Sequence, residues 1–234
     1  MRQDGGMQRD EGVIKYQCHW QSEPPLALET LAPLIQERDR LFAAGLIGVY
    51  PDGIGYGNVS LRLPGQGFVI SGTQTGHLPT TGPEHYSQVT TWDIAQNYLH
   101  CTGPLKASSE SLTHAALYDH RFRTGLSRIG AIAHIHHRGL WQQYQGILPT
   151  TCASVAYGTP AMAAEMIRLF HDTDLAVGRI LVMAGHEDGL IAFGETVADA
   201  AQKLLDLATQ GSAGTLFFSE SLTSCESLDQ RCMI

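Results

Sequence analysis

An apolar run at residues 129–133 leads directly into two histidines, His134 and His136. Side chains alternate along a strand, so residues i and i+2 lie on the same face. Neutral imidazole nitrogen is a preferred ligand of zinc and related divalent ions, and catalytic zinc sites commonly combine three protein ligands with one open position. The pair is therefore a candidate for half of a metal site, with a purely structural role as the alternative.

A third candidate ligand is His186, in the turn Met183–Gly189 between two apolar segments. Polar residues in loops at the mouth of strands are often functional, because a rigid scaffold positions them there. The alternative for His186 is an ordinary solvated histidine in a turn.

Glu110 follows Ser108 and Ser109 and supports two interpretations. In the first, a serine caps a helix and the acidic residue lies in its first turn. In the second, the free amides and hydroxyls of the helix start bind phosphate, while Glu110 moves protons beside a metal. The spacing alone favours the cap.

Two glycine-rich turns, at residues 55–60 and 71–76, each adjoin a predicted strand and expose amides and hydroxyls that suit an anion. Neither matches a P-loop or a dinucleotide-binding fingerprint, and alone each is typical of an ordinary turn. Lys106 is a possible Schiff-base lysine. The concentration of metal-ligating residue types favours a metal mechanism instead.

The composition limits the class of protein. The chain has 234 residues, 43% of them hydrophobic, and a net charge of −8, which disfavours nucleic-acid binding. We expect neither a signal peptide nor a membrane span, because no sufficiently long apolar segment is present. Five scattered cysteines without C-x-x-C pairing predict a reducing cytoplasm rather than a disulfide framework.

Hydrophobic periodicity predicts a single α/β domain with a mixed or antiparallel sheet. The expected helices are 26–46 (stopped by Gly45), one beginning near 108, 161–170 and 197–209, the last capped by Thr196. The expected strands are 59–63, 68–71, 129–136, 180–184 and 190–193. Residues 1–12 are expected to be flexible, 13–210 to form the domain, and 211–234 to form a tail of uncertain structure.

Several short motifs follow one another in a characteristic order: Gly57-Asn58-Val59-Ser60, Ile70-Ser71-Gly72-Thr73, Ser108-Ser109-Glu110 with His114, His134-Ile135-His136, Tyr157-Gly158-Thr159-Pro160, and His186 followed by Gly189. Together they resemble the class II aldolase/adducin family, which includes fuculose-phosphate and rhamnulose-phosphate aldolases and ribulose-phosphate 4-epimerase. The resemblance covers roughly residues 30 to 208.

The resemblance implies a three-layer α/β/α fold around a mainly antiparallel sheet, and assembly as a homotetramer. It implies that His134, His136 and His186 hold a divalent metal, usually zinc with manganese as an alternative, and that Glu110 is the acid/base residue. It also implies a set of residues that bind the substrate phosphate, supported by Thr73: Gly57, Asn58, Ser60, Ser71, Gly72, Ser108 and Ser109.

The function implied is a lyase that cleaves a small keto-sugar phosphate by a retro-aldol step through a metal-stabilised enediolate. Epimerase, decarboxylase and dehydratase activities use similar sites and remain alternatives. A non-catalytic, adducin-like binding domain is a further alternative, but such a domain is expected to lack the metal histidines.

Two departures from the family pattern affect these expectations. Glu187 and Asp188 separate His186 from Gly189, so Asp188 is an alternative third ligand. We favour His186, because a third imidazole completes a matched nitrogen set. The family aldolases also use tyrosines from a mid-chain loop and the C-terminus. No tyrosine follows Tyr157, so the group that protonates the aldehyde product is unassigned.

Overall fold

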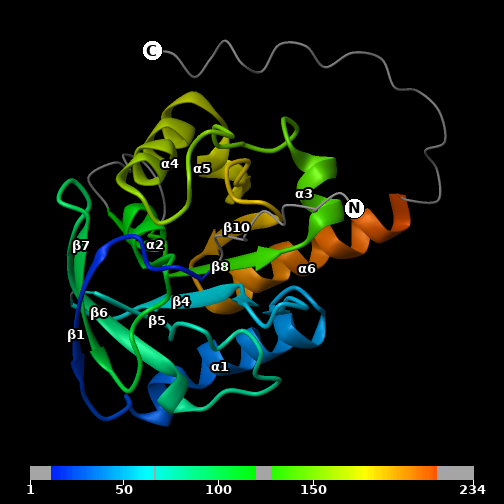
Figure 1. Ribbon diagram of the computed structural model, residues 1–234. Coiled ribbons are helices and arrows are strands. Elements are labelled where there is room, and N and C mark those ends of the chain that lie inside the picture. Colours follow the sequence, from blue (N-terminus) through cyan, green and yellow to red (C-terminus); the bar gives the residue numbers. More distant parts are fainter. Residues whose placement is uncertain (1–11, 66, 120–127, 215–234) are drawn as a thin grey trace, which may run out of the picture.

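The structure, a computed structural model, describes residues 12–65, 67–119 and 128–214, and a sheet of eight strands forms its centre (Figure 1). The strand order is β1-β7-β6-β5-β4-β8-β10-β9, and every pair is antiparallel except β1 with β7. The strands of this sheet are β1 (Gln17–Ser22), β4 (Asn58–Arg62), β5 (Phe68–Ser71), β6 (Tyr86–Asp93), β7 (Tyr98–Gly103), β8 (Ala131–His136), β9 (Ile180–Val182) and β10 (Gly189–Gly194). A separate pair is formed by β2 (Gly48–Val49) and β3 (Gly55–Tyr56).

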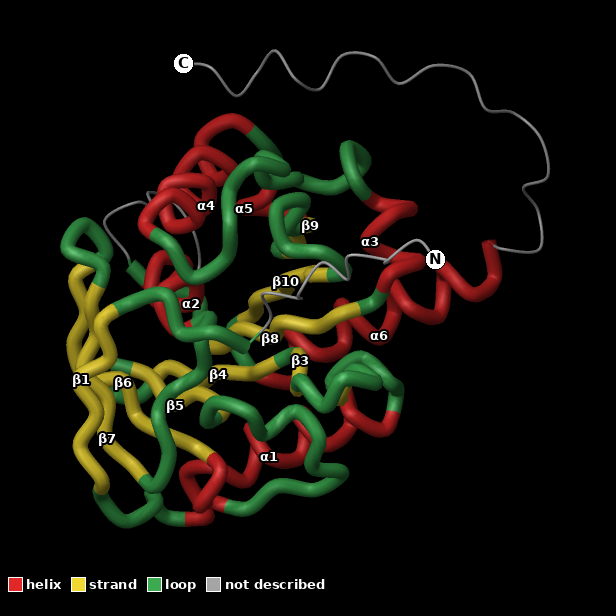
Figure 2. The backbone as a smooth tube through the Cα atoms, viewed as in Figure 1, coloured by secondary structure: helices red, strands yellow, loops and turns green. Residues whose placement is uncertain are grey.

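Helices cover both faces of the sheet, as Figure 2 shows. One layer consists of α1 (Leu28–Ala43), α3 (Arg138–Tyr144) and α6 (Val197–Gly214), and the other of α2 (Ser111–Tyr118), α4 (Pro160–Asp172) and α5 (Leu175–Gly178). A short 3-10 helix, η1 (Pro83–His85), precedes β6. This arrangement confirms the three-layer α/β/α fold with a mainly antiparallel sheet.

Strand β8 shows how the sheet divides its side chains between two cores. Ala131, Ala133 and Ile135 pack in the core beneath α1 and α6. Ile132 packs in the opposite core with α2 and α4, and by alternation His134 and His136 share its face. The predicted strand therefore delivers both histidines to the same side of the sheet.

The predicted helix signals at Gly45 and Thr196 are confirmed, and Thr159 provides a further cap that was not predicted. Gly45 has a φ of 73°, the left-handed conformation that ends many helices, directly after α1. The Thr159 hydroxyl accepts a hydrogen bond from the Met162 amide at the start of α4. Thr196 and Asp199 cap α6 reciprocally, each side chain accepting from the backbone amide of the other.

Other predictions need correction. Neither serine caps α2: Glu110 itself occupies the N-cap position, with no side-chain capping hydrogen bond. Strands β1, β6 and β7 were not predicted, since their sequences are too polar to show a clear apolar alternation. Cys18 and Cys101 are free, but Cys152 is disulfide-bonded, which the cysteine spacing did not predict.

The expectations at the two ends of the chain lie largely outside the described residues. Residues 1–11 and 215–234 are not described, and α6 continues to Gly214, past its expected end at 209. Within the part of the chain that is described, no helix is both long and apolar enough to cross a membrane.

Candidate metal centre and anion cavity

The register of three neighbouring segments brings the histidine cluster together. In the antiparallel pair β8–β10, His136 lies opposite Gly189 and His134 opposite Ile191. His186 lies in the turn just before β10, where the Gly189 amide donates to the His186 carbonyl. The candidate ligand atoms of His134, His136 and His186 all lie within 4.8 Å of one another, and the three side chains are buried.

Gly189 makes room for this cluster. A Cβ added at Gly189 would lie 3.2 Å from His134 Nε2 and 3.3 Å from His186 Cγ. Contacts this short would push one or both imidazoles aside. The absence of a side chain at position 189 therefore allows the histidines to converge.

Glu110 completes the cluster from the start of α2. Its carboxylate oxygens lie 3.3 Å from His134 Nδ1 and 3.0 Å from His186 Nδ1, and the residue is 1% exposed. Burial disfavours the charged carboxylate, but His134 and His186 oppose this and hold the pKa of Glu110 at about 2. Glu110 is therefore an ionised base at neutral pH, and its side chain faces the histidines rather than capping the helix.

Tyrosine side chains contact two of the three histidines, His136 and His186. The Tyr50 hydroxyl lies 2.7 Å from His136 Nδ1, and the Tyr56 ring stacks on His136. The Tyr157 ring stacks on His186, with ring centroids 4.3 Å apart. The Nδ1 atom of each cluster histidine thus faces another side chain, which favours Nε2 as the metal-facing nitrogen.

Ser60 does not lie with the anion-binding residues that the resemblance implied. Its hydroxyl is buried between His114 Nδ1, at 2.7 Å, and the Tyr118 hydroxyl, at 2.8 Å. Burial lowers the pKa of His114 to about 3, although Glu110 works in the opposite direction, so its imidazole is neutral at pH 7. Ser60 therefore belongs to a buried polar network beneath the metal centre.

A small polar cavity adjoins the histidine cluster. Asn58 connects the two, because it lines the cavity while its Nδ2 lies 3.3 Å from His134 Nδ1. The lining includes Gly57, Asn58, Gly72, Ser108 and Ser109 of the set implied by the resemblance. It also includes Gly12, Gly55, Thr73, Gln74, Thr75 and Gly76. The two glycine-rich turns therefore meet at one cavity, which their separate motifs did not predict.

Two further candidates lie apart from these features. The Ser71 hydroxyl bridges β4 and β5 by accepting from the Val59 amide at 3.2 Å, and Ser71 does not line the cavity. Asp188, buried with a φ of 67°, is not a member of the histidine cluster. The geometry thus favours His186 over Asp188 as the third ligand.

Some residues of the site carried no individual prediction. Gly55, Gln74, Thr75 and Gly76 line the cavity and lie within the two glycine-rich turns that suit an anion, but only Thr73 among residues 73–76 had a predicted supporting role. Tyr50 had no comparable signal, because its contact with His136 spans 86 positions of sequence.

The chain belongs to the class II aldolase family. Residues 52–210 match the model of the class II aldolase and adducin N-terminal domain, which covers well over half of the chain. No curated protein matches the chain.

Solved structures share the fold at low sequence identity. YgbL from Klebsiella pneumoniae, described as an aldolase, epimerase or decarboxylase, is 19% identical with a TM-score of 0.61, over 84% of this chain and 94% of its own. The l-fuculose-1-phosphate aldolase from Thermus thermophilus is 22% identical with a TM-score of 0.55, over 79% and 92%. A sugar-phosphate aldolase from Thermotoga maritima is 15% identical with a TM-score of 0.61, over 82% and 97%.

Proposed function

We propose that this protein is a metal-dependent lyase that cleaves a small keto-sugar phosphate by a retro-aldol step. The observation that carries this proposal is the contact between two features: a buried His134–His136–His186 cluster with an ionised Glu110, and a polar cavity that shares Asn58 with it. A chelating sugar group and a phosphate on one small substrate would occupy these two features together.

The donor set fits a divalent metal, and we propose zinc. Three buried imidazoles within 4.8 Å of one another match the three-ligand pattern of catalytic zinc sites, and side chains at the Nδ1 atoms orient the rings. When bound, such a cation acts as a Lewis acid that stabilises the negative charge developing on the substrate oxygens.

The residues of the chain supply positioning and proton transfer. Polar groups that line the cavity, including the hydroxyls of Ser108 and Ser109, bind the phosphate and so hold the reacting carbons over the cluster. Glu110 moves a proton at the carbon that keeps the electrons of the broken bond: in aldol synthesis the carboxylate removes this proton, and in cleavage the proton that leaves the substrate hydroxyl returns to this carbon through Glu110.

The same features support neighbouring activities. An epimerase, a decarboxylase or a dehydratase would use the same cluster with a different substrate. A binding domain without chemistry is disfavoured by the presence of three converging histidines and Glu110. We further propose, from the family resemblance, that the protein is a homotetramer, and, from its composition and charge, that it acts in the cytoplasm and binds no nucleic acid.

The test has two stages. We expect about one equivalent of zinc or manganese per chain in purified protein, measured by elemental analysis. The metal-loaded protein is then incubated with a panel of ketose 1-phosphates, and dihydroxyacetone phosphate and aldehyde are measured. A metal content near zero that added zinc does not raise would support a binding domain. A loaded enzyme that releases neither product from any ketose would exclude the aldolase.

A further inference from the structure

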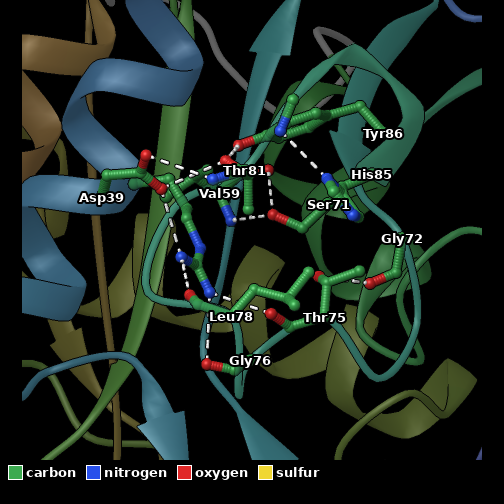
Figure 3. Close-up of polar contacts among 12 residues, drawn as sticks. Asp39, Val59, Ser71, Gly72, Thr75, Gly76, Leu78, Thr81, His85 and Tyr86 are labelled. Atoms are coloured by element: carbon green, nitrogen blue, oxygen red, sulfur yellow. Dashed lines mark hydrogen bonds and ion pairs between the residues drawn. The ribbon is translucent and has the colours of Figure 1, made fainter.

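Residues 72–76 form one wall of the proposed anion cavity. Arg38 of α1 contacts the backbone of this segment from the protein interior. Arg38 is 1% exposed, and its guanidinium donates hydrogen bonds to the carbonyls of Thr75, at 2.9 Å, and Gly76, at 3.1 Å, and also to that of Leu78. Figure 3 shows these carbonyls converging on one point. The turn therefore directs its acceptors away from the cavity and into the protein.

The planarity of the peptide unit links these carbonyls to the opposite side of the turn. In a trans peptide, the carbonyl of one residue and the N–H of the next point in opposite directions. Holding the carbonyls of Thr75 and Gly76 toward Arg38 turns the amides of Gly76 and His77 the other way. On that side the turn meets the second glycine-rich segment, since a Cβ on Gly55 would lie 3.1 Å from the Gly76 nitrogen.

The next residue of the same helix, Asp39, contacts the chain just beyond this turn, at Thr81. Asp39, which lies 3.1 Å from Arg38, accepts hydrogen bonds from the Thr81 amide at 3.2 Å and its hydroxyl at 3.1 Å (Figure 3). Two consecutive residues of α1 thus anchor the segment between β5 and β6 at two points, residues 75–78 and Thr81.

Arginine suits this role for a specific reason. Its planar guanidinium presents five donors in a fixed fork, whereas a lysine ammonium is a point charge on a flexible stem. Burying a charge is costly unless hydrogen bonds and an opposite charge compensate it. The carbonyls of the turn and Asp39 provide this compensation, so the charge is tied to one conformation of the turn.

We propose that Arg38 is a positioning residue for anion binding: by holding the carbonyls of Thr75 and Gly76, it orients the Gly76 amide, at the cavity wall, toward the substrate phosphate. The inference rests on the proposed function, because that function places a phosphate in the cavity. Arg38 itself touches no substrate and acts through the backbone of the turn. It lies on α1, before the part of the chain that matches the family model.

The test compares variants of two arginines on one helix, with inorganic phosphate as the probe. Arg38→Met removes the fork but keeps an apolar stem, and Arg40→Met is the matched control, since Arg40 is 47% exposed and bonds Glu37 and Gln202. We expect Arg38→Met to weaken phosphate binding, measured by calorimetry, about tenfold or more. Without Arg38 the turn no longer holds its amide toward the phosphate, and losing one charge-assisted hydrogen bond between an amide and a phosphate has an effect of that order. Arg40→Met should bind phosphate as the unaltered protein does.

Three additional measurements separate positioning from a general loss of structure. Metal content should stay at the unaltered level in Arg38→Met. On any ketose phosphate that is turned over, KM should rise while kcat changes little. Arg38→Lys, which keeps the charge and serves if the methionine variant does not fold, should also bind phosphate more weakly, because an ammonium cannot hold three carbonyls in a fixed geometry.

Each outcome is decisive. Phosphate affinity at the unaltered level in either folded Arg38 variant overturns the role of Arg38 and leaves the proposed function intact. An unaltered protein that carries metal but does not bind phosphate at millimolar concentration overturns the anion cavity, and the role of Arg38 with it.

Discussion

The candidate metal centre and the proposed anion cavity lie side by side but are built by different means. The histidines of the candidate metal centre come from β8 and the turn before β10, so the register of a buried sheet positions them. The anion cavity is lined mainly by turns, whose conformation depends on side chains elsewhere, such as Arg38. The comparison teaches that sheet register mainly positions the first feature, whereas contacts with side chains distant in the sequence help to position the second.

The largest expected effect comes from removing a ligand. We predict that His136→Ala abolishes metal binding and activity while the protein remains folded, because the two hydrophobic cores do not depend on a catalytic metal. Elemental analysis, circular dichroism and an activity assay would measure this. His100→Ala, on the exposed surface of β7, is the control. Stoichiometric metal in folded His136→Ala would remove His136 from the ligand set.

The next effect separates the base from the ligands. We predict that Glu110→Gln keeps the metal and lowers turnover by about 10²- to 10⁴-fold, the usual contribution of a general acid or base. The amide has nearly the same shape but cannot accept a proton. Glu187→Gln, an exposed change in the same region, should retain turnover. If Glu110→Gln retained full activity, Glu110 would have only a structural role at the start of α2.

The same difference between register and remote support explains what could be predicted from the sequence. The cluster follows from local patterns, because an apolar run that ends in two alternating histidines determines their face. Ser60 shares a motif with Asn58, yet it contacts His114 and Tyr118 rather than the cavity. The motif identified the strand, but the contact that each side chain makes depends on what α2 places above it.

The side chains that position the site from elsewhere in the fold could not be predicted, because their contacts join parts of the chain that are distant in sequence. Tyr50 reaches His136 across 86 positions, and Arg38 reaches Gly76 across 38. An arginine within the charged run Glu37–Arg40 of an amphipathic helix predicts a solvated side chain. Only the packing of α1 against the segment between β5 and β6 buries it.

A smaller effect tests whether the candidate metal centre also depends on a side chain that is distant in sequence, Tyr50. We predict that Tyr50→Phe weakens metal affinity about 10- to 100-fold, the usual effect of removing a hydrogen bond that orients a ligand histidine. Competition with a chelating dye would measure it. Tyr56→Phe, which keeps the ring stacked on His136, is the control. Equal affinities in the two variants would show that the Tyr50 hydroxyl does not orient His136.

The smallest effect tests the boundary between the two features. Because the Ser60 hydroxyl is fully buried between His114 and Tyr118, we predict that Ser60→Ala destabilises the protein by about 1–3 kcal/mol, the cost of leaving buried polar partners unsatisfied. Chemical denaturation would measure the free energy of unfolding.

Phosphate affinity should not change in Ser60→Ala, because Ser60 does not line the cavity. Ser109→Ala provides the contrast, since Ser109 does line it and should lose phosphate affinity. A loss of phosphate affinity in Ser60→Ala equal to that in Ser109→Ala would return Ser60 to the anion-binding set. A loss of stability without a loss of affinity would assign Ser60 to the network that supports the metal centre from beneath, so the cavity would end at Asn58.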